Sequence, residues 1–308
     1  MWRPDRLLPP VAALAASILI VLAGTTKVHA ADKDYGYARA ARLSAEKKHD
    51  EALAILIKGL RQAEGGNDTH LAFFLARNLS SCHERLGNLT ACIEMAERAI
   101  VHLDALDMLD PPHLPVTSRA YERTLLTGLI AKHCLQANRL ALARHWHERE
   151  GDALRRMYAL LGTPDLDLMN GQVPRTFFRL KGKPNRSQIA RYLWMGAWLL
   201  EMEARTHEAL ANLEAAERYL DRLDGRPDPV EAGYRYKIRN RKALLLDFLG
   251  HDQEAIALQR ETASGEMEED HARSVWIERM TLQVGLANYH GPSEIYVQAA
   301  IEAYQALR

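Results

Sequence analysis

The stretches Leu86-Gly-Asn-Leu-Thr-Ala-Cys-Ile93 and Leu249-Gly-His-Asp-Gln-Glu-Ala-Ile256 share one pattern. In each stretch a glycine follows leucine, and a small residue and an isoleucine come five and six positions after that glycine. Gly87 and Gly250 suit the left-handed backbone conformation that often ends a helix. Both stretches therefore predict one helix that ends, a short turn, and a second helix that begins.

Three further short turns occupy residues 47–50, 137–139 and 205–207. Asn138 also suits the left-handed conformation, whereas Lys47 and Ala204 fall in the same slot and suit it less. Short turns between helical segments are typical of antiparallel helical pairs. The sequence thus predicts five such pairs joined by similar turns.

Apolar residues between these turns recur three and four positions apart, as in Leu53, Leu56, Ile57 and Leu60. This spacing places them on one face of a helix, and residues 35–308 carry almost none of the strict alternation that is typical of strands. With 47% hydrophobic and only 7% aromatic residues, the chain has enough apolar mass for a large core. We expect an all-α fold.

Small residues occupy matched positions on both sides of every turn. In the first helices they are Ala40, Ser80, Ala131, Ala197 and Ala243. Twelve residues later in each pair they are Ala52, Cys92, Ala143, Ala209 and Ala255. Small side chains that face each other allow two helices to approach closely, so these ten positions predict the contact within each pair.

These turns and the helix starts that follow them resemble the tetratricopeptide repeat. The resemblance covers residues 35–308, and it implies a right-handed α-solenoid of about five to six stacked helical hairpins. The hairpins are farther apart than the family period of about 34 residues, which predicts longer helices and inserts. A last helical pair is expected at 269–308, without the small-residue match. Residues 31–308 are therefore predicted to form one repeat domain.

An irregular insert at 162–187 interrupts the expected array. It contains three glycines and three prolines, acidic residues in its first half, and basic residues around Phe177 and Phe178 in its second half. Long structureless segments within compact arrays are often functional, so a binding or lid loop is one interpretation of the insert. The alternative is a spacer that Phe177 and Phe178 pin to the helices.

Residues 1–30 have the pattern of a secretory signal peptide. Arg3 and Arg6 precede an uncharged run at 7–24, and Val28 and Ala30 are small residues before a predicted cleavage point. We therefore expect an exported protein, periplasmic or extracellular. The alternative is an uncleaved anchor at 7–24, which would hold the rest of the chain at the membrane but outside the cytoplasm.

The formal net charge is zero, with 40 basic and 40 acidic residues. This balance argues against a dedicated nucleic-acid binder, which needs an excess of Lys and Arg for phosphate contacts. Three cysteines, Cys82, Cys92 and Cys134, cannot all pair within one chain. A Cys82–Cys92 bridge is one interpretation, and buried free thiols are the other.

Recognisable catalytic and cofactor motifs are absent from the sequence. His83-Glu84, His147-Glu148 and His207-Glu208 each lack the second histidine, four residues on, that a zinc protease helix needs. There is no glycine-rich phosphate loop, no GxSxG motif and no CxxC pair. The sequence therefore predicts no enzyme, no cofactor and no metal site.

A basic stripe is expected on one helix, because Arg235, Arg239 and Lys242 are spaced four and three residues apart. Three cations on one face predict a site for an anionic peptide, a carboxylate or a polyanion. The alternative is a solvated face whose cations pair with acids of the neighbouring hairpin.

The resemblance implies that the first helix of each hairpin lines a concave groove that binds peptide. We align the hairpins on their small residues and transfer the groove-facing positions of the family to this sequence. These positions are Phe74, Arg77, Glu84, Arg85, Lys132, Arg191, Trp194, Trp198, Asn240 and Asp247. Trp194 and Trp198 share a helix face and predict an anchor beside Arg191, because Trp and Arg dominate interface energetics. The alternative is that both tryptophans pack under the 162–187 insert.

The sequence therefore predicts an exported scaffold, adaptor or assembly factor that binds another protein or a peptide segment. It predicts no nucleic-acid partner, and a membrane contact only through an uncleaved N-terminus. The alternative function is a solenoid that holds a small molecule or glycan on Trp194, Trp198 and Arg191. The oligomeric state is left open.

Overall fold

A computed structural model describes residues 35–109, 114–180, 183–225 and 227–264 of the chain. The predicted signal segment 1–30 and the predicted last helical pair 269–308 lie outside these described residues. The helices are α2 (Tyr37–Ala45), α3 (His49–Gly65), α4 (Thr69–Arg85), α5 (Leu89–Asp107), α6 (Val116–Gln136), α7 (Leu140–Leu160), α8 (Ser187–Met202), α9 (Thr206–Asp221), α10 (Pro229–Phe248) and α11 (Asp252–Ser264). The two short strands are β1 (Arg179–Leu180) and β2 (Lys183–Pro184). The expectation of an all-α fold is confirmed for the described residues, apart from this one two-residue hairpin.

The described residues divide into two compact units. Unit 1 contains α2 to α7 and residues 174–185, and unit 2 contains residues 167–173 and α8 to α11. The chain therefore passes from one unit to the other within the predicted insert. Each unit is described by itself below.

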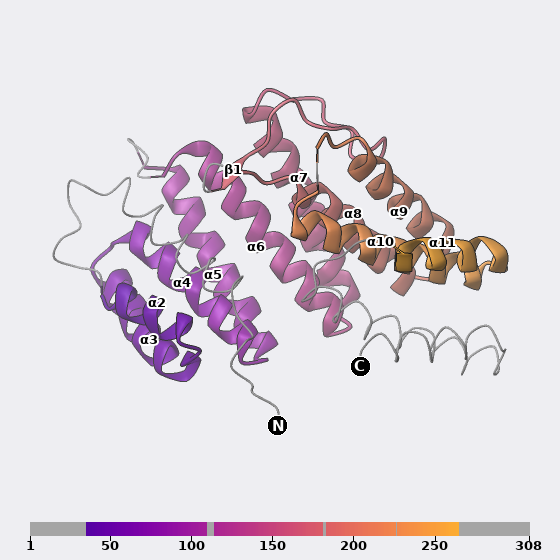
Figure 1. The fold of residues 1–308 in the computed structure, drawn as a ribbon. Helices are drawn as coiled ribbons and strands as arrows, with labels where there is room; N and C mark the ends of the chain where they lie inside the picture. Colours follow the sequence, from indigo (N-terminus) through magenta and orange to yellow (C-terminus); the bar gives the residue numbers. More distant parts are fainter. Residues whose placement is uncertain (1–34, 110–113, 181–182, 226, 265–308) are drawn as a thin grey trace. The chain divides into compact units, whose positions relative to one another are not determined.

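In unit 1 every helix packs on the next one along the chain, from α2 to α7 (Figure 1). The first helices of successive pairs run in the same direction, since Arg77 and Glu84 of α4 contact Glu122 and Lys132 of α6 in ascending order. The second helix α5 runs against the first helix α6, since Asp104 and Asp107 of α5 pair with Arg123 and Arg119 of α6 in descending order. Unit 1 therefore repeats one up-and-down arrangement.

Unit 2 follows the same arrangement with α8 packed on α9, α9 on α10 and α10 on α11 (Figure 1). The start of α10 is fixed locally: Asp228 accepts a hydrogen bond from the Glu231 backbone, and the Glu231 side chain accepts one from the Asp228 backbone. Pro229 supplies the first helical residue, where its missing N–H costs nothing. A capping box and a proline thus set where this first helix begins.

All five short turns have the same backbone geometry. The second residue after each first helix has a positive φ, and these residues are Lys47, Gly87, Asn138, Ala204 and Gly250. The next N–H then bonds to the carbonyl oxygen five residues back, at 2.8–2.9 Å in every turn. This is a Schellman motif, which satisfies carbonyl groups left open at the helix end. The slot holds this conformation even where the residue is Lys or Ala.

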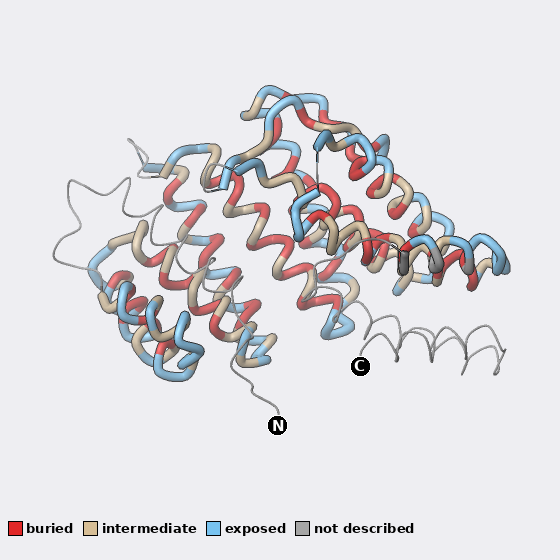
Figure 2. Tube along the Cα trace, viewed as in Figure 1, coloured by how far each residue is buried: buried red, intermediate tan, exposed pale blue. Residues whose placement is uncertain are grey.

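The ten small residues predicted to lie at the helix contacts are all buried. Nine of them expose no surface, and Ala255 exposes 2%. In the α4–α5 pair the Ser80 hydroxyl donates a 2.9 Å hydrogen bond to the carbonyl oxygen of Cys92. Burial runs along the inward faces of the helices in both units (Figure 2). The small-residue register therefore marks the interior of each pair.

The predicted insert is held at both ends, by different units. In unit 2, Arg218 and Arg222 of α9 donate to the carbonyl oxygens of Met169 and Asn170. In unit 1, Phe178 stacks on Tyr121 of α6 with ring centroids 4.1 Å apart. These contacts agree with a spacer pinned to the helices, as the second interpretation of the insert expected.

The pinning in unit 1 involves both phenylalanines. Phe177 meets Tyr158 of α7 edge-on, with ring centroids 6.4 Å apart. Asn185, the residue directly after β2, donates a 3.0 Å hydrogen bond to the Tyr121 hydroxyl. The two-stranded hairpin is thus fixed at its base.

The three cysteines are buried free thiols, so the interpretation of a Cys82–Cys92 bridge is wrong. Cys92 lies instead against Ser80, with 3.3 Å between the thiol sulfur and the hydroxyl oxygen. Among the described helices, none combines the length and the apolar character that crossing a membrane requires.

Candidate partner-binding face

The first helices of unit 1 carry five of the predicted groove residues. Phe74 is half-buried and contacts Tyr37 and His70 edge-on. Arg77 forms a 2.7 Å ion pair with Glu122 of α6, and both side chains are largely buried. These contacts use the predicted groove residues to join one first helix to the next.

Glu84 is at the centre of a second link between α4 and α6. Its carboxylate accepts a 2.9 Å hydrogen bond from Lys132 and lies 3.3 Å from the imidazole of His133. His133 lowers the pKa of Glu84 to about 2, outweighing the opposing effect of burial, and Lys132 adds to the lowering.

The imidazole of His133 is almost fully buried. Burial alone would lower its pKa, but contacts with Cys92, Glu84 and Gln136 raise it to about 9. His133 is therefore protonated at neutral pH, and the single carboxylate of Glu84 faces the two cations Lys132 and His133. Arg85 is exposed and has no acidic partner in the described part of unit 1.

In unit 2, Trp194 and Trp198 of α8 are both half-exposed, with ring centroids 5.8 Å apart. Tyr234 of α10 meets Trp194 edge-on at 6.4 Å. Lys237 lies over the Trp194 ring at 5.8 Å, and Arg241 lies over the Trp198 ring at 5.3 Å. We call these five residues the aromatic–cation cluster.

The cluster differs from the predicted anchor in the residues that surround the two tryptophans. The cations over the indole rings come from α10 rather than from Arg191, which is half-exposed on α8. The ring partners of the tryptophans also lie on α8 and α10, not on the insert. Asn240 is half-exposed, whereas Asp247 is buried and offers no open carboxylate.

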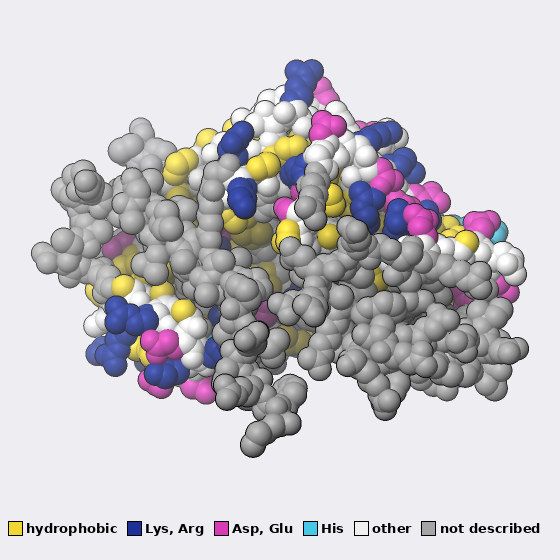
Figure 3. Space-filling model, in the orientation of Figure 1, with side chains coloured by type: hydrophobic (Ala, Val, Ile, Leu, Met, Phe, Trp, Pro, Cys, Tyr) yellow, Lys and Arg dark blue, Asp and Glu magenta, His cyan; other side chains and the backbone are white. Residues whose placement is uncertain are grey.

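The three cations of the predicted basic stripe all have acidic partners. Arg235 pairs with Asp221 of α9, and Arg239 and Lys242 both pair with Glu217 at 3.1 and 2.7 Å. Over α9, basic and acidic side chains are interspersed (Figure 3). This is the arrangement that the alternative interpretation of the stripe expected, and it leaves the cations little capacity for another anion.

One of these ion pairs recurs at the same register in both units. Arg235 lies eight residues before the small residue of its helix, and Asp221 lies twelve residues after the small residue of the preceding helix. Arg123 and Asp104 occupy the same two slots in unit 1 and also form an ion pair. The stripe is thus part of the helix-to-helix contact.

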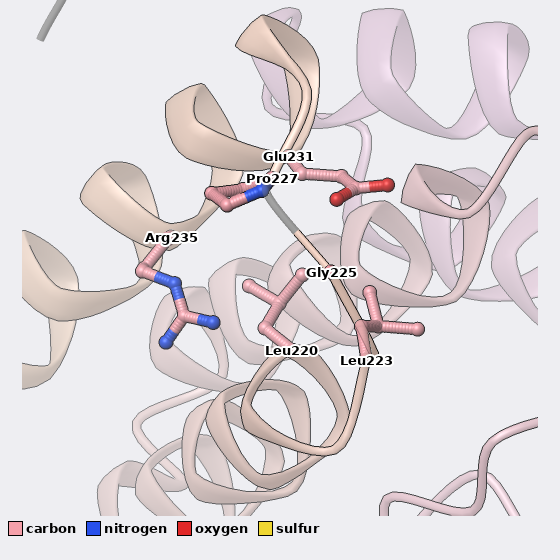
Figure 4. Close-up of a pocket in the computed structure, with 6 residues that line it drawn as sticks. All are labelled: Leu220, Leu223, Gly225, Pro227, Glu231 and Arg235. Carbon is pink, nitrogen blue, oxygen red and sulfur yellow. The ribbon is translucent and has the colours of Figure 1, made fainter.

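A small hollow lies where α9 turns into α10 (Figure 4). It is lined by Leu220, Leu223, Gly225, Pro227, Glu231 and Arg235. Its volume of about 30 Å³ is the room of roughly one water molecule. Glu231 is committed to Arg186, whose guanidinium binds it through two hydrogen bonds of 2.6 Å. The hollow is therefore too small for an organic ligand.

Tyr234 and Glu122 were not among the predicted site residues. Tyr234, Lys237 and Arg241 are spaced three and four residues apart, so the sequence placed them on one face of the helix. Which neighbouring helix that face meets depends on the stacking of hairpins, and that is visible only in the structure.

Among the described side chains, no three of His, Cys, Asp and Glu are arranged so that they could hold a metal ion. No protein-family model matches the chain, and neither a curated protein nor a solved structure matches it.

Proposed function

We propose that the chain is an exported α-solenoid, right-handed and similar to tetratricopeptide repeats, with about five to six helical hairpins. Five equal turns, ten buried small residues and parallel first helices support this proposal. Each hairpin buries its inner face only when a neighbour covers it, so a stack of hairpins exposes one continuous row of first helices.

We propose that it binds another protein through this row, as a scaffold, adaptor or assembly factor. The observation that carries the proposal is the half-buried pair Trp194 and Trp198, one helical turn apart on a first helix. Aromatic side chains at a partly open surface bury a large area when a partner covers them. The first helices α2, α4 and α6 of unit 1 carry no tryptophan, so unit 2 is the stronger candidate.

A glycan or small-molecule site remains the second candidate, because tryptophans also stack on sugars. In the cluster a cation already lies over each indole ring, and a stacking sugar would need to displace Lys237 or Arg241. The hollow between α9 and α10, described above, is also too small to hold a sugar or another organic ligand. These observations favour a protein partner.

Site-specific crosslinking in the native host tests the proposal. A photoreactive benzoylphenylalanine replaces Asn240 on the first helix α10, and a control chain carries it at Ala211, which is exposed on α9. We expect a protein crosslink from position 240 and none from position 211. Equal crosslinking from both positions, or none from either, would overturn the proposal for this face.

The proposed export is tested separately by sequencing the N-terminus of the purified native protein. A chain that begins at Ala31 indicates a cleaved signal peptide. A chain that retains residues 7–24 and sediments with membranes indicates the anchor, and a full-length soluble chain would contradict both.

A further inference from the structure

The aromatic–cation cluster combines an apolar surface with charge, and the two components restrict what can bind. Trp194, Trp198 and Tyr234 form a continuous set of three rings across α8 and α10. Each of these side chains can bury roughly 150–250 Å² when it is fully covered. A ligand that gains from these rings must bring apolar surface of its own, which a free phosphate or sulfate lacks.

The charge of the cluster is not neutralised within the described part of unit 2. Arg241 donates a 2.7 Å hydrogen bond to Glu201 of α8, so its charge is compensated. Lys237 is exposed, lies 5.8 Å from Trp194 and 5.7 Å from Tyr234, and has no carboxylate partner among the described residues. Within the part of the chain that the structure describes, the cluster therefore presents one ammonium group without a carboxylate partner beside the three rings.

The neighbouring basic residues do not share this property. Arg235, Arg239 and Lys242 each have an acid of α9 as partner, on the opposite side of α10 from Lys237. In unit 1, Arg77 and Lys132 of the first helices are likewise paired with acids. Among the described first helices, a lysine without a carboxylate partner beside half-buried aromatic rings is therefore a feature of this cluster.

We infer that the cluster binds a protein segment in which an Asp or Glu side chain stands next to a large apolar side chain. The inference rests on the proposed protein-binding function and names the chemistry of the partner. The apolar side chain packs beside Trp194 and Trp198 rather than over the ring faces that Lys237 and Arg241 cover, and the carboxylate pairs with Lys237. The rings partly desolvate that ion pair, which strengthens it relative to one in open water.

Three pools of fluorescein-labelled nonapeptides test the inference by fluorescence anisotropy against the purified full chain. All have a central Leu-Phe, flanked by Glu in the first pool, by Gln in the second and by Lys in the third. The peptide ends are blocked, so only side chains carry charge. We expect the Glu pool to bind at least about tenfold more tightly than the Gln pool, and the Lys pool more weakly still.

Matched variants locate the binding. Lys237→Glu should weaken binding of the Glu pool at least about tenfold and bring it below the level of the Gln pool, because the variant adds a like-charge repulsion. Lys58→Glu makes the same charge change at an exposed position of α3, and it should leave binding within about twofold. Trp198→Phe should weaken all pools that bind, because it removes ring area and leaves the charge unchanged.

The outcomes separate the inference from the proposed function. If the Gln or Lys pool binds as well as the Glu pool and Trp198→Phe weakens it, the face binds protein but the acidic preference is wrong. If no pool binds and no crosslink forms from position 240, the proposed function fails as well. If oligosaccharides quench tryptophan fluorescence and no peptide pool binds, the cluster is a glycan site and the inference is overturned.

Discussion

The hydroxyl of Ser80 lies 2.9 Å from the carbonyl oxygen of Cys92, across the closest approach of α4 and α5. Twelve residues separate them, and the same interval separates the small residues of the other four pairs. The interval follows from two hydrogen bonds of the turn. His83, three residues after Ser80, accepts the bond of the Schellman motif from Asn88, five residues further on. Asn88 in turn accepts the first hydrogen bond of α5 from Cys92, four residues later.

A larger side chain at one of these positions should destabilise the pair. We expect Ala209→Leu to lower the free energy of unfolding by about 1–3 kcal/mol, because the added volume must separate α8 and α9. Ala211→Leu on the exposed face of α9 is the matched control and should change it by less than about 0.5 kcal/mol. Thermal unfolding followed by circular dichroism measures both, and equal stability of the two variants would show that Ala209 is not at a close contact.

The helices, turns and small-residue contacts could be predicted from the sequence because they depend on residues close together in the chain. Gly87, Asn138 and Gly250 signal their turns directly, and Ala204 could be placed only by its register with them. The pairing of each cation depends on which helix packs against its face. The sequence therefore allows two interpretations of the stripe at Arg235, an anion site or a set of ion pairs. The position of Asp221 on α9 shows that Arg235 is in an ion pair.

The cluster around the tryptophans was predicted in part. The shared face of Trp194 and Trp198 follows from their four-residue spacing. The contribution of Tyr234 and Lys237 does not, because forty residues of chain separate Trp194 from Tyr234, and only the packing of α10 on α8 brings them together.

The turn at Ala204 stores conformational strain that glycine would relieve. Its φ is +60°, a conformation that costs an L-residue about 1–2 kcal/mol. Glycine also increases the entropy of the unfolded chain, so we expect Ala204→Gly to stabilise the protein by about 0.5–1 kcal/mol net.

The reverse change at the equivalent slot is the control for that prediction. Gly250 has a φ of +82°, and a Cβ added there would meet no atom within 4 Å. Gly250→Ala should therefore destabilise by about 1 kcal/mol through backbone strain alone. Chemical denaturation measures both variants, and a destabilising Ala204→Gly would contradict the strain.

The Glu84–His133 pair predicts a stability maximum in mildly acidic solution. Glu84 has a lowered pKa, so its contribution is complete above about pH 4.5 and is lost as the pH falls towards 2. His133 has a raised pKa, so its contribution is complete below about pH 6.5 and is lost as the pH rises through 9. The pair therefore contributes most between these two limits.

His133→Gln tests the alkaline side of this prediction. We expect the melting temperature of the unchanged protein to fall more steeply between pH 6.5 and 9 than that of the variant. His251→Gln, at an exposed histidine of unit 2, should retain the steep fall. Parallel pH profiles for the unchanged protein and His133→Gln would show that His133 does not couple protonation to folding.

The two ion pairs at the start of α10 should differ strongly in their effect on stability. Glu231 exposes 2% of its side chain and holds Arg186 through two hydrogen bonds, so Glu231→Gln leaves a guanidinium without its counter-charge. We expect a loss of about 3 kcal/mol. Asp221→Asn breaks the solvent-exposed pair with Arg235 and should cost less than about 1 kcal/mol. Urea denaturation that ranks the two variants in the opposite order would contradict this assignment.

The contacts of Phe178 predict that the insert is a fixed spacer rather than a lid. Its ring is stacked on Tyr121 with an interplanar angle of 14°, and an aromatic pair of this kind contributes about 0.5–1.5 kcal/mol beyond burial. Phe178→Ala should therefore increase the open population of the hairpin about three- to tenfold, and trypsin should cleave after Arg179 faster by the same factor.

Leu180→Ala changes an exposed side chain on the same hairpin and should leave the cleavage rate unchanged. The variants also test the lid directly, because a lid that moves to admit a ligand spends part of its time away from Tyr121 before any substitution. If the unchanged protein is already cleaved as fast as Phe178→Ala, the stacked contact does not hold the insert. Slow cleavage of the unchanged protein, with acceleration only in Phe178→Ala, shows that the stacked ring is what keeps the hairpin on α6.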